Sequence, residues 1–226
     1  METLLLQDVA VHPELDTVLK ILRMPHPSEE DRTDIAAMLQ AAEAVANPKA
    51  LYGPALLTEK DEDSVTVEGI RLCSPLIREN LDKTSRIVPF VATCGTELED
   101  WSAGFSDPLT AYWADGIKMA YLAEIRGRLS DAVRNAWFQQ GDMSVMSPGS
   151  LSAWPLTEQR ALFKLVGQVT EKIGVRLTAS CLMLPSKSVS GFFFSATSHY
   201  ENCRYCPLLT CPARRAPFEG EHTYAL

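Results

Sequence analysis

The sequence predicts an α+β protein in which a mixed or antiparallel sheet packs against several helices. Short runs of β-branched and aromatic residues gather in two parts of the chain, at 50–93 and 176–196. Before and between these runs, apolar residues recur every three or four positions, as on one face of a helix. Helical and strand segments are therefore grouped rather than strictly alternating, which is typical of α+β folds.

Composition and charge limit the classes of protein that remain. The 226 residues suffice for one large domain or two small ones, and 46% apolar with 22% charged residues is ordinary for a globular protein. A net charge of −8 argues against a nucleic-acid partner. The first residues contain no basic leader, and no apolar run approaches the roughly 20 residues of a membrane helix, so we expect a cytoplasmic protein without membrane contacts.

Residues 1–85 are expected to form a helical and β region within the same domain as the residues that follow. Capping residues and a proline mark where its helices begin and end. The expected elements, in order, are a strand at 6–11, a helix begun by Pro13, a helix capped by Ser28 and ended before Pro48, and strands at 50–57 and 64–73.

Residues 86–200 are expected to form the core of the fold. Asp107 followed by Pro108 is typical of the cap and first residue of a long helix, here running to about Gln140. The other expected elements are a strand at 87–93, a helix capped by Thr157 and ended by Gly174, and β-like runs at 176–183 and 188–196.

A series of short motifs in residues 147–200 resembles a known family. In order and spacing they resemble the activation (reactivation) domain of cobalamin-dependent methionine synthase, and the upstream stretch VATCGTELEDW at 91–101 resembles the same family's Ala-Val-Thr-x-Gly-x-x-Glu segment before a long helix. The motifs are Pro148–Gly149, Thr157–Glu158, Gly174–Val175, Leu177–Thr178, Ser180, Met183, Pro185 and Ser188–Val189–Ser190–Gly191.

The resemblance implies a fold, a partner and a set of binding residues. In the family the domain binds S-adenosylmethionine and docks over a corrinoid-carrying domain, so that inactive cob(II)alamin is reduced and remethylated. The implied ligand-binding edge contains Pro148, Gly149, Ser188 and Ser190. From the residues alone, Pro148–Gly149 is equally a tight turn, and alternating serines are common on half-exposed strands.

Two positions depart from the family pattern. The methyl donor is gripped in the family by an Arg-x-x-x-Gly-Tyr signature around the Pro-Gly turn, but here Val145 stands at the arginine position and Ser150 at the tyrosine position. An isopropyl group offers none of the bidentate donors of a guanidinium. We therefore expect weak binding of S-adenosylmethionine at best.

The end of the chain, residues 201–226, contains three closely spaced cysteines, Cys203, Cys206 and Cys211. Cytoplasmic thiols stay reduced, so this spacing favours metal ligands over disulfides. The pattern favours an iron–sulfur cluster of the 4Fe-4S type, because a structural zinc site usually has a second Cys-x2-Cys pair. Structural zinc and free or redox-active thiols are the alternatives.

A four-iron cluster needs a fourth ligand, for which Cys181 is the first candidate because it lies in the β-like run before the tail. It also alternates with apolar residues, so it is equally a buried small hydrophobe. Cys94 and His199 are weaker candidates, and Cys73 is expected in the core.

Two functions follow. The first is an accessory protein for the reductive activation of a corrinoid methyltransferase system, whose cluster relays one electron to the corrinoid. The second is a non-catalytic module that binds a corrinoid protein and uses zinc or a cluster to hold its tail.

Overall fold

The computed structural model describes residues 2–196, 200–211 and 214–220. Its centre is an eight-stranded sheet with the order β1-β2-β6-β3-β4-β5, in which β10 pairs with β6 and β7 pairs with β10. Every pairing in this sheet is antiparallel. The predicted α+β class is confirmed, and the sheet is antiparallel rather than mixed.

The strands are short, apart from two long ones that meet in the middle of the sheet. These are β6 (Arg86–Thr93) and β10 (Ser188–Ala196). The others are β1 (Leu4–Leu6), β2 (Lys49–Tyr52), β3 (Ala55–Lys60), β4 (Ser64–Val67), β5 (Ile70–Cys73) and β7 (Asp142–Met146), while β8 (Arg176–Leu177) and β9 (Met183–Leu184) form a separate hairpin.

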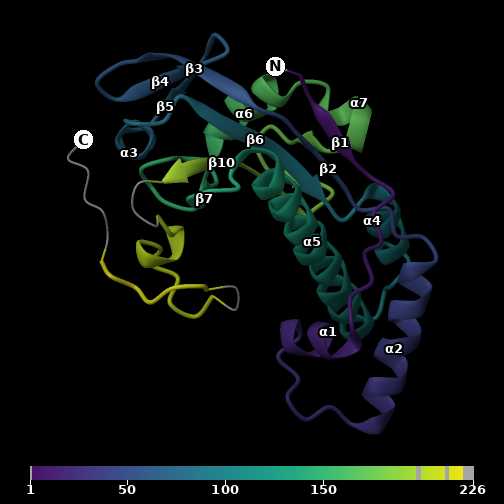
Figure 1. Cartoon of the computed structure of the whole chain (residues 1–226). Helices are drawn as coiled ribbons and strands as arrows, with labels where there is room; N and C mark the ends of the chain where they lie inside the picture. Colours follow the sequence, from purple (N-terminus) through teal and green to yellow (C-terminus); the bar gives the residue numbers. More distant parts are fainter. Residues whose placement is uncertain (1, 197–199, 212–213, 221–226) are drawn as a thin grey trace.

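The helices cover both faces of the sheet. The longest, α5 (Pro108–Trp137), packs on one face of the sheet, and α1 (Leu15–Ile21) and α2 (Glu29–Glu43) pack against α5, as Figure 1 shows. Shorter helices complete the fold: α3 (Pro75–Asn80), α4 (Thr96–Ser102), α6 (Gln159–Val166) and α7 (Val169–Ile173), with 3-10 helices at Leu156–Glu158 and Asn202–Arg204. None of the described helices is both long and apolar enough to cross a membrane.

Alternate side chains of β10 enter different parts of the core. Phe193 packs with the residues under α5, including a stacked contact with Phe90. Phe192 and Phe194 point to the other face, where they join Trp154 and residues of α6. This alternation is what a strand buried on both faces requires. The strand β10 therefore contributes side chains to two separate hydrophobic clusters, one on each face of the sheet.

Helix caps explain why α2 and α5 begin where the sequence predicts. Ser28 accepts a hydrogen bond from the backbone N–H of Asp31, whose carboxylate accepts one from Ser28 in return. Asp107 accepts from the N–H groups of Leu109 and Thr110 at the start of α5.

Five expected elements differ from the structure. The strand expected at 50–57 is two strands, β2 and β3, separated by Gly53 and Pro54. The strand expected at 6–11 is shorter and lies at Leu4–Leu6. The run at 64–73 is a hairpin, because Glu68 and Gly69 adopt positive φ and reverse the chain. Thr157 is not a helix cap but lies inside the 3-10 turn Leu156–Glu158, and the helix expected from there to Gly174 breaks at Gly167–Gln168, again at positive φ, into α6 and α7. The run at 176–183 is the β8–β9 hairpin rather than one strand.

Gly191 lets β7 approach β10 closely. A Cβ placed on Gly191 would overlap the carbonyl oxygen of Met146 and lie 2.8 Å from the hydroxyl of Ser147. Both obstacles belong to the segment that leads from β7 into the Pro148–Gly149 turn. The glycine of the Ser-Val-Ser-Gly motif is therefore a packing requirement in this chain.

Gly191→Ala should lower the free energy of unfolding by about 1–3 kcal/mol, because backbone must move to admit the methyl group. Gly127→Ala is the matched control, since Gly127 lies inside α5 and a Cβ there meets no atom within 4 Å. The control should stabilise the protein by about 0.5–1 kcal/mol. Urea unfolding measures both, and equal effects of the two changes would contradict this account of Gly191.

Candidate functional site

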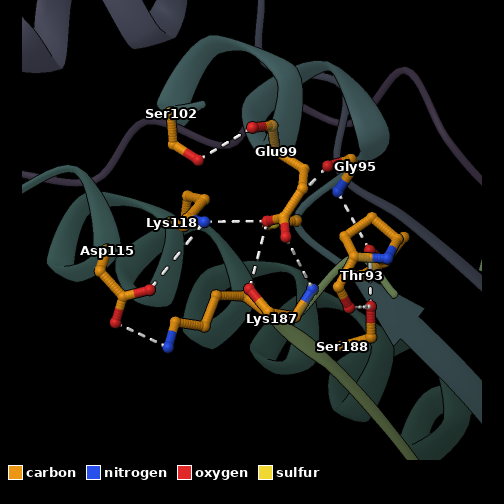
Figure 2. A network of polar contacts seen from close by, with 11 residues as sticks. Thr93, Gly95, Glu99, Ser102, Asp115, Lys118, Lys187 and Ser188 are labelled. Carbon is orange, nitrogen blue, oxygen red and sulfur yellow. Dashed lines mark hydrogen bonds and ion pairs between the residues drawn. The ribbon is translucent and has the colours of Figure 1, made fainter. Parts of the chain in front are cut away.

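A network of polar side chains lies where β6 ends and β10 begins (Figure 2). The register pairs Thr93 with Ser188, the last residue of β6 with the first of β10. The Oγ atom of Ser188 lies 2.9 Å from Oγ1 of Thr93 and 2.8 Å from the carbonyl oxygen of Pro185. Residues from α4, α5 and the segment 185–187 gather around this point.

The turn from β6 into α4 requires glycine at position 95. Gly95 has a φ of 101°, and its N–H donates to the Thr93 hydroxyl over 3.1 Å. A Cβ at this position would lie 2.6 Å from the carbonyl oxygen of Asn47. The turn directs α4 so that its first turn, which carries Glu97 and Glu99, lies next to the end of the sheet.

The carboxylate of Glu99 joins three separate parts of the chain. It accepts a hydrogen bond from Nζ of Lys118 over 2.8 Å, and from the N–H and hydroxyl of Ser186 over 3.4 and 3.2 Å. Lys118 lies in α5, and Ser186 lies just before β10. One carboxylate thus fixes α4 to α5 and to the start of β10.

Two lysines and a second carboxylate extend the network. Lys187 Nζ lies 2.7 Å from the carboxylate of Asp115, and Lys118 Nζ lies 3.9 Å from the same group. The side chains of Lys118 and Lys187 are 8% and 18% exposed, whereas that of Asp115 is 51% exposed. The cations are therefore held inside the network, and Asp115 is its solvent-facing member.

The protein environment changes the acidity of two groups here. Burial acts to raise the pKa of Glu99, but the hydrogen bond and charge of Lys118, with the bonds from Ser186, outweigh it and lower the pKa. Burial raises the pKa of the Cys94 thiol to about 12. Cys94 is thus a neutral thiol near neutral pH, which makes it a poor nucleophile and a poor metal ligand.

The residues expected at the ligand-binding edge are bonded within the protein. Ser188 belongs to the network described above. Ser190 is buried, and its hydroxyl donates to Gln159 over 3.0 Å. The N–H of Gly149 donates to the carbonyl oxygen of Trp154 over 2.8 Å, which closes the turn after Pro148. The structure brings Ser188 to the polar network, while Ser190 and the Pro148–Gly149 turn have structural partners of their own.

The two departures from the family signature lie on either side of that turn. Val145 is in β7, opposite Phe193, and packs against the core under α5. The N–H of Ser150 donates to the carbonyl oxygen of Ser147 over 3.3 Å. Neither side chain supplies the charged or phenolic donor of the family signature.

The three cysteines expected to bind a metal lie in the segment that follows β10. Cys203, Cys206 and Cys211 are free, half-buried thiols. Among the described residues, no group of three or more His, Cys, Asp and Glu side chains is arranged to hold a metal ion. The thiolate chemistry of these residues suits iron–sulfur or zinc binding, and their role as metal ligands stays a prediction.

Two of the other cysteines lie in settings that differ from those the sequence predicts. Cys181 is 1% exposed and lies in the β8–β9 turn with a φ of 64°, not on the face of a strand as expected. Its carbonyl oxygen accepts a hydrogen bond from Gln159 of α6. Cys73, expected in the core, is exposed, and His199 lies outside the described residues.

The tail begins at the opposite end of β10 from the polar network. The ring of Tyr200 lies 6.0 Å from that of Phe194, and the ring of Tyr205 lies 5.9 Å from that of Tyr200. Further on, Arg23 donates to the carbonyl oxygen of Thr210 over 3.0 Å. The Pro148–Gly149 turn follows Met146, which pairs with Phe192 nearer the start of β10. Tyr200 and Tyr205 pack in the same cluster as Leu151 and Trp154, and the expectation that the cysteines converge beside this turn stays a prediction.

A cavity of about 640 Å³ lies between α1 and the start of α2, and contains none of the residues expected at the site. Apolar and cationic side chains both contribute to the lining of this cavity. The lining residues are Asp16, Leu19, Lys20, Arg23, Met24, Pro25, Pro27 and Arg32.

Sequence reasoning missed most of the network. Glu99 lies inside the quoted VATCGTELEDW stretch, but no partner for it was predicted. Asp115 and Lys118 stand three positions apart in α5, a spacing that signals a local ion pair. Lys118 binds Glu99 instead at a much shorter distance, and that pairing depends on how α4 and α5 pack.

Comparisons with known proteins confirm the resemblance. Residues 146–205 match the family model described as "Vitamin B12 dependent methionine synthase, activation domain". The fold matches the crystal structure of the MetH reactivation domain bound to AdoHcy, with a TM-score of 0.65 and 16% identity over 89% of this chain and 81% of that one. At this identity the structural likeness establishes the fold alone. None of the curated proteins matches the chain in sequence.

Lys118→Met should destabilise the protein by about 1–3 kcal/mol at neutral pH, because it leaves the Glu99 carboxylate partly buried without its cation. The pKa of Glu99 is lowered in the folded protein, so its ionised form stabilises the fold above the ordinary carboxyl pKa. That contribution is lost as the pH falls through the lowered pKa. The difference from wild type should therefore shrink as the pH falls below the ordinary carboxyl pKa and through the lowered pKa of Glu99.

Urea unfolding at several pH values measures this difference. Asp115→Asn is the control, because it removes an ion pair whose carboxylate is 51% exposed and should cost less than about 1 kcal/mol. A pH-independent effect of Lys118→Met would show that its ammonium does not act through Glu99.

Proposed function

We propose that this protein assists the reductive activation of a corrinoid protein by docking on the corrinoid-carrying partner. The observation that carries the proposal is the match of residues 146–205 to the methionine synthase activation domain. The fold shared with the MetH reactivation domain supports it. The corrinoid of the partner carries out the cobalt chemistry, and this chain supplies the surface on which the corrinoid-carrying partner docks. We place the protein in the cytoplasm, where such methyltransferase systems would meet it.

The polar network is the part of this surface most suited to binding. Its donors and acceptors are held by α4, α5 and the start of β10, so little order is lost when a ligand binds. Asp115 faces solvent, and Lys187 bonds to it over 2.7 Å. This pair can exchange its mutual hydrogen bond for bonds to amide or phosphate groups, both of which corrinoids carry.

We propose that S-adenosylmethionine is bound less tightly by this protein than by members of the family. The solved neighbour is described as bound to AdoHcy, whereas this chain offers the Val145 and Ser150 side chains beside its Pro148–Gly149 turn. Glu99 is already bonded to Lys118 and Ser186. The proposed activity therefore relies on docking rather than on a tightly held methyl donor.

The iron–sulfur relay through Cys203, Cys206, Cys211 and Cys181 is the finer part of the hypothesis. Thiolates at these positions would hold such a cluster, and the described residues show no group of three ligands. The second candidate function, a non-catalytic module that binds a corrinoid protein, needs no electron-transfer step. The arrangement of the tail around an arginine, described below, favours that candidate.

The direct test mixes the protein with the isolated corrinoid-binding part of a cobalamin-dependent methionine synthase in the cob(II)alamin state. The protein should alter the visible and electron paramagnetic resonance spectra of the cobalt, and with a low-potential reductant it should speed reactivation. The Asp115→Lys and Lys187→Glu variants should each weaken both effects, because each reverses one charge of the network. Unchanged spectra at saturating protein would contradict the proposed function.

Binding of S-adenosylmethionine should be weak. The absence of a charge-assisted pair and a hydrogen bond costs a few kcal/mol, so the dissociation constant should be roughly two orders of magnitude above that of a site with both groups. Isothermal titration calorimetry measures it. The Val145→Arg/Ser150→Tyr double variant should bind more tightly, and low-micromolar binding by the wild-type protein would show that other contacts hold the ligand.

A further inference from the structure

Arg214 occupies the middle of the cysteine-containing tail. The Nη1 atom of Arg214 donates to the carbonyl oxygens of Cys203 and Ala216, the latter over 3.2 Å. Its Nη2 atom donates to the carbonyl oxygens of Cys206 and Leu208 over 2.6 and 3.0 Å. One guanidinium thus gathers carbonyl groups from both sides of the cysteine loop.

The Nη atoms of Arg214 make as many hydrogen bonds as they have N–H groups. A guanidinium has four Nη–H groups in a fixed planar fork, and each of those in Arg214 has one carbonyl partner. Only the Nε–H is buried without one. Hydrogen bonds from a charged donor are stronger than those between neutral groups, so the set is well suited to hold a segment that has little regular structure.

Other contacts tie this arrangement to the body of the protein. Arg215 pairs with Glu201 over 2.8 Å, and Arg204 pairs with Glu219 over 3.3 Å. Tyr205 stacks on Tyr200, whose ring lies 6.0 Å from that of Phe194 in β10. These contacts join the two ends of the tail to each other and to β10, while the loop between them closes on Arg214.

The guanidinium binds backbone carbonyl groups of the same loop that carries the cysteines. In a metal-centred loop the cysteine sulfurs converge, and the fold of the loop depends on the ion. Here the carbonyl groups of Cys203 and Cys206 converge on a cation that belongs to the chain itself. The described residues contain no group of three ligands.

We propose that Arg214 is the organising centre of the tail, and that the tail folds around this guanidinium without a metal ion or cluster. Cys203, Cys206 and Cys211 then remain separate thiols on a loop whose order does not depend on them. Lysine cannot replace Arg214, because an ammonium group has three donors and no planar fork.

Hydrogen exchange of the tail tests this proposal on the full-length protein, reduced and treated with chelator, after assays for iron, acid-labile sulfide and zinc. The informative amides are those of Arg204, Tyr205 and Cys211, which donate to Glu201, Asn202 and Leu208. Arg214→Ala and Arg214→Lys should each speed their exchange by about tenfold or more, because the carbonyl groups lose their common partner.

Two controls distinguish the effect of Arg214 on hydrogen exchange from the effect of the cysteine thiols. Arg215→Ala removes the neighbouring arginine and one ion pair, and should change exchange less than about threefold. The Cys203→Ser/Cys206→Ser/Cys211→Ser variant should also leave exchange nearly unchanged. Loss of protection in the triple-serine variant or on chelation of the wild-type protein, or retained protection in Arg214→Ala, would overturn the proposal.

Discussion

The antiparallel pairing of β6 with β10 is the constraint on which the rest of the structure depends. It runs from Ser188 opposite Thr93 to Phe194 opposite Ile87, and it joins the strands on one side of the sheet to β7 on the other. Its register places the start of β10 beside the turn into α4, where the polar network forms. It also fixes where the chain leaves the sheet, and so where the tail starts.

Side chains of very different chemistry secure the two ends of this pairing. At the first end, Glu99 bonds to Lys118 and Ser186 and so holds α4, α5 and the start of β10 together. At the second, aromatic rings continue from Phe194 through Tyr200 to Tyr205. The tail then closes around Arg214. The network and the tail are therefore separate structures, and the proposed docking function requires only the first.

The sequence predicts best what local interactions decide. The caps at Ser28 and Asp107 lie next to the helices they begin, and the class of fold and the resemblance to the activation domain both follow from patterns along the chain. The break at Gly167–Gln168 is harder to predict, because apolar spacing continues across it from α6 into α7. Cys181 shows the same limit, since alternation along 176–183 is compatible with either a strand or a hairpin, and the hairpin places it in a turn.

The candidate site and the tail depend on contacts that spacing does not reveal. Lys118 bonds Glu99 because α4 packs on α5, and two charged residues 19 positions apart carry no mark of it in the sequence. Cysteine spacing indicates what thiols can bind, but not whether they converge. The partners of Arg214 are backbone carbonyl groups, which every residue has, so the sequence gives no sign that this arginine rather than Arg215 lies at the centre.

The central claim is that the end of the β6–β10 pairing is the surface that meets a corrinoid protein. The most direct measurement is a hydrogen-exchange footprint of this protein in complex with a cobalamin-loaded corrinoid domain. The account predicts protection concentrated in residues 94–102 and 185–190, with residues 200–211 unchanged. Protection confined to the tail or to α2, with none at the polar network, would contradict it.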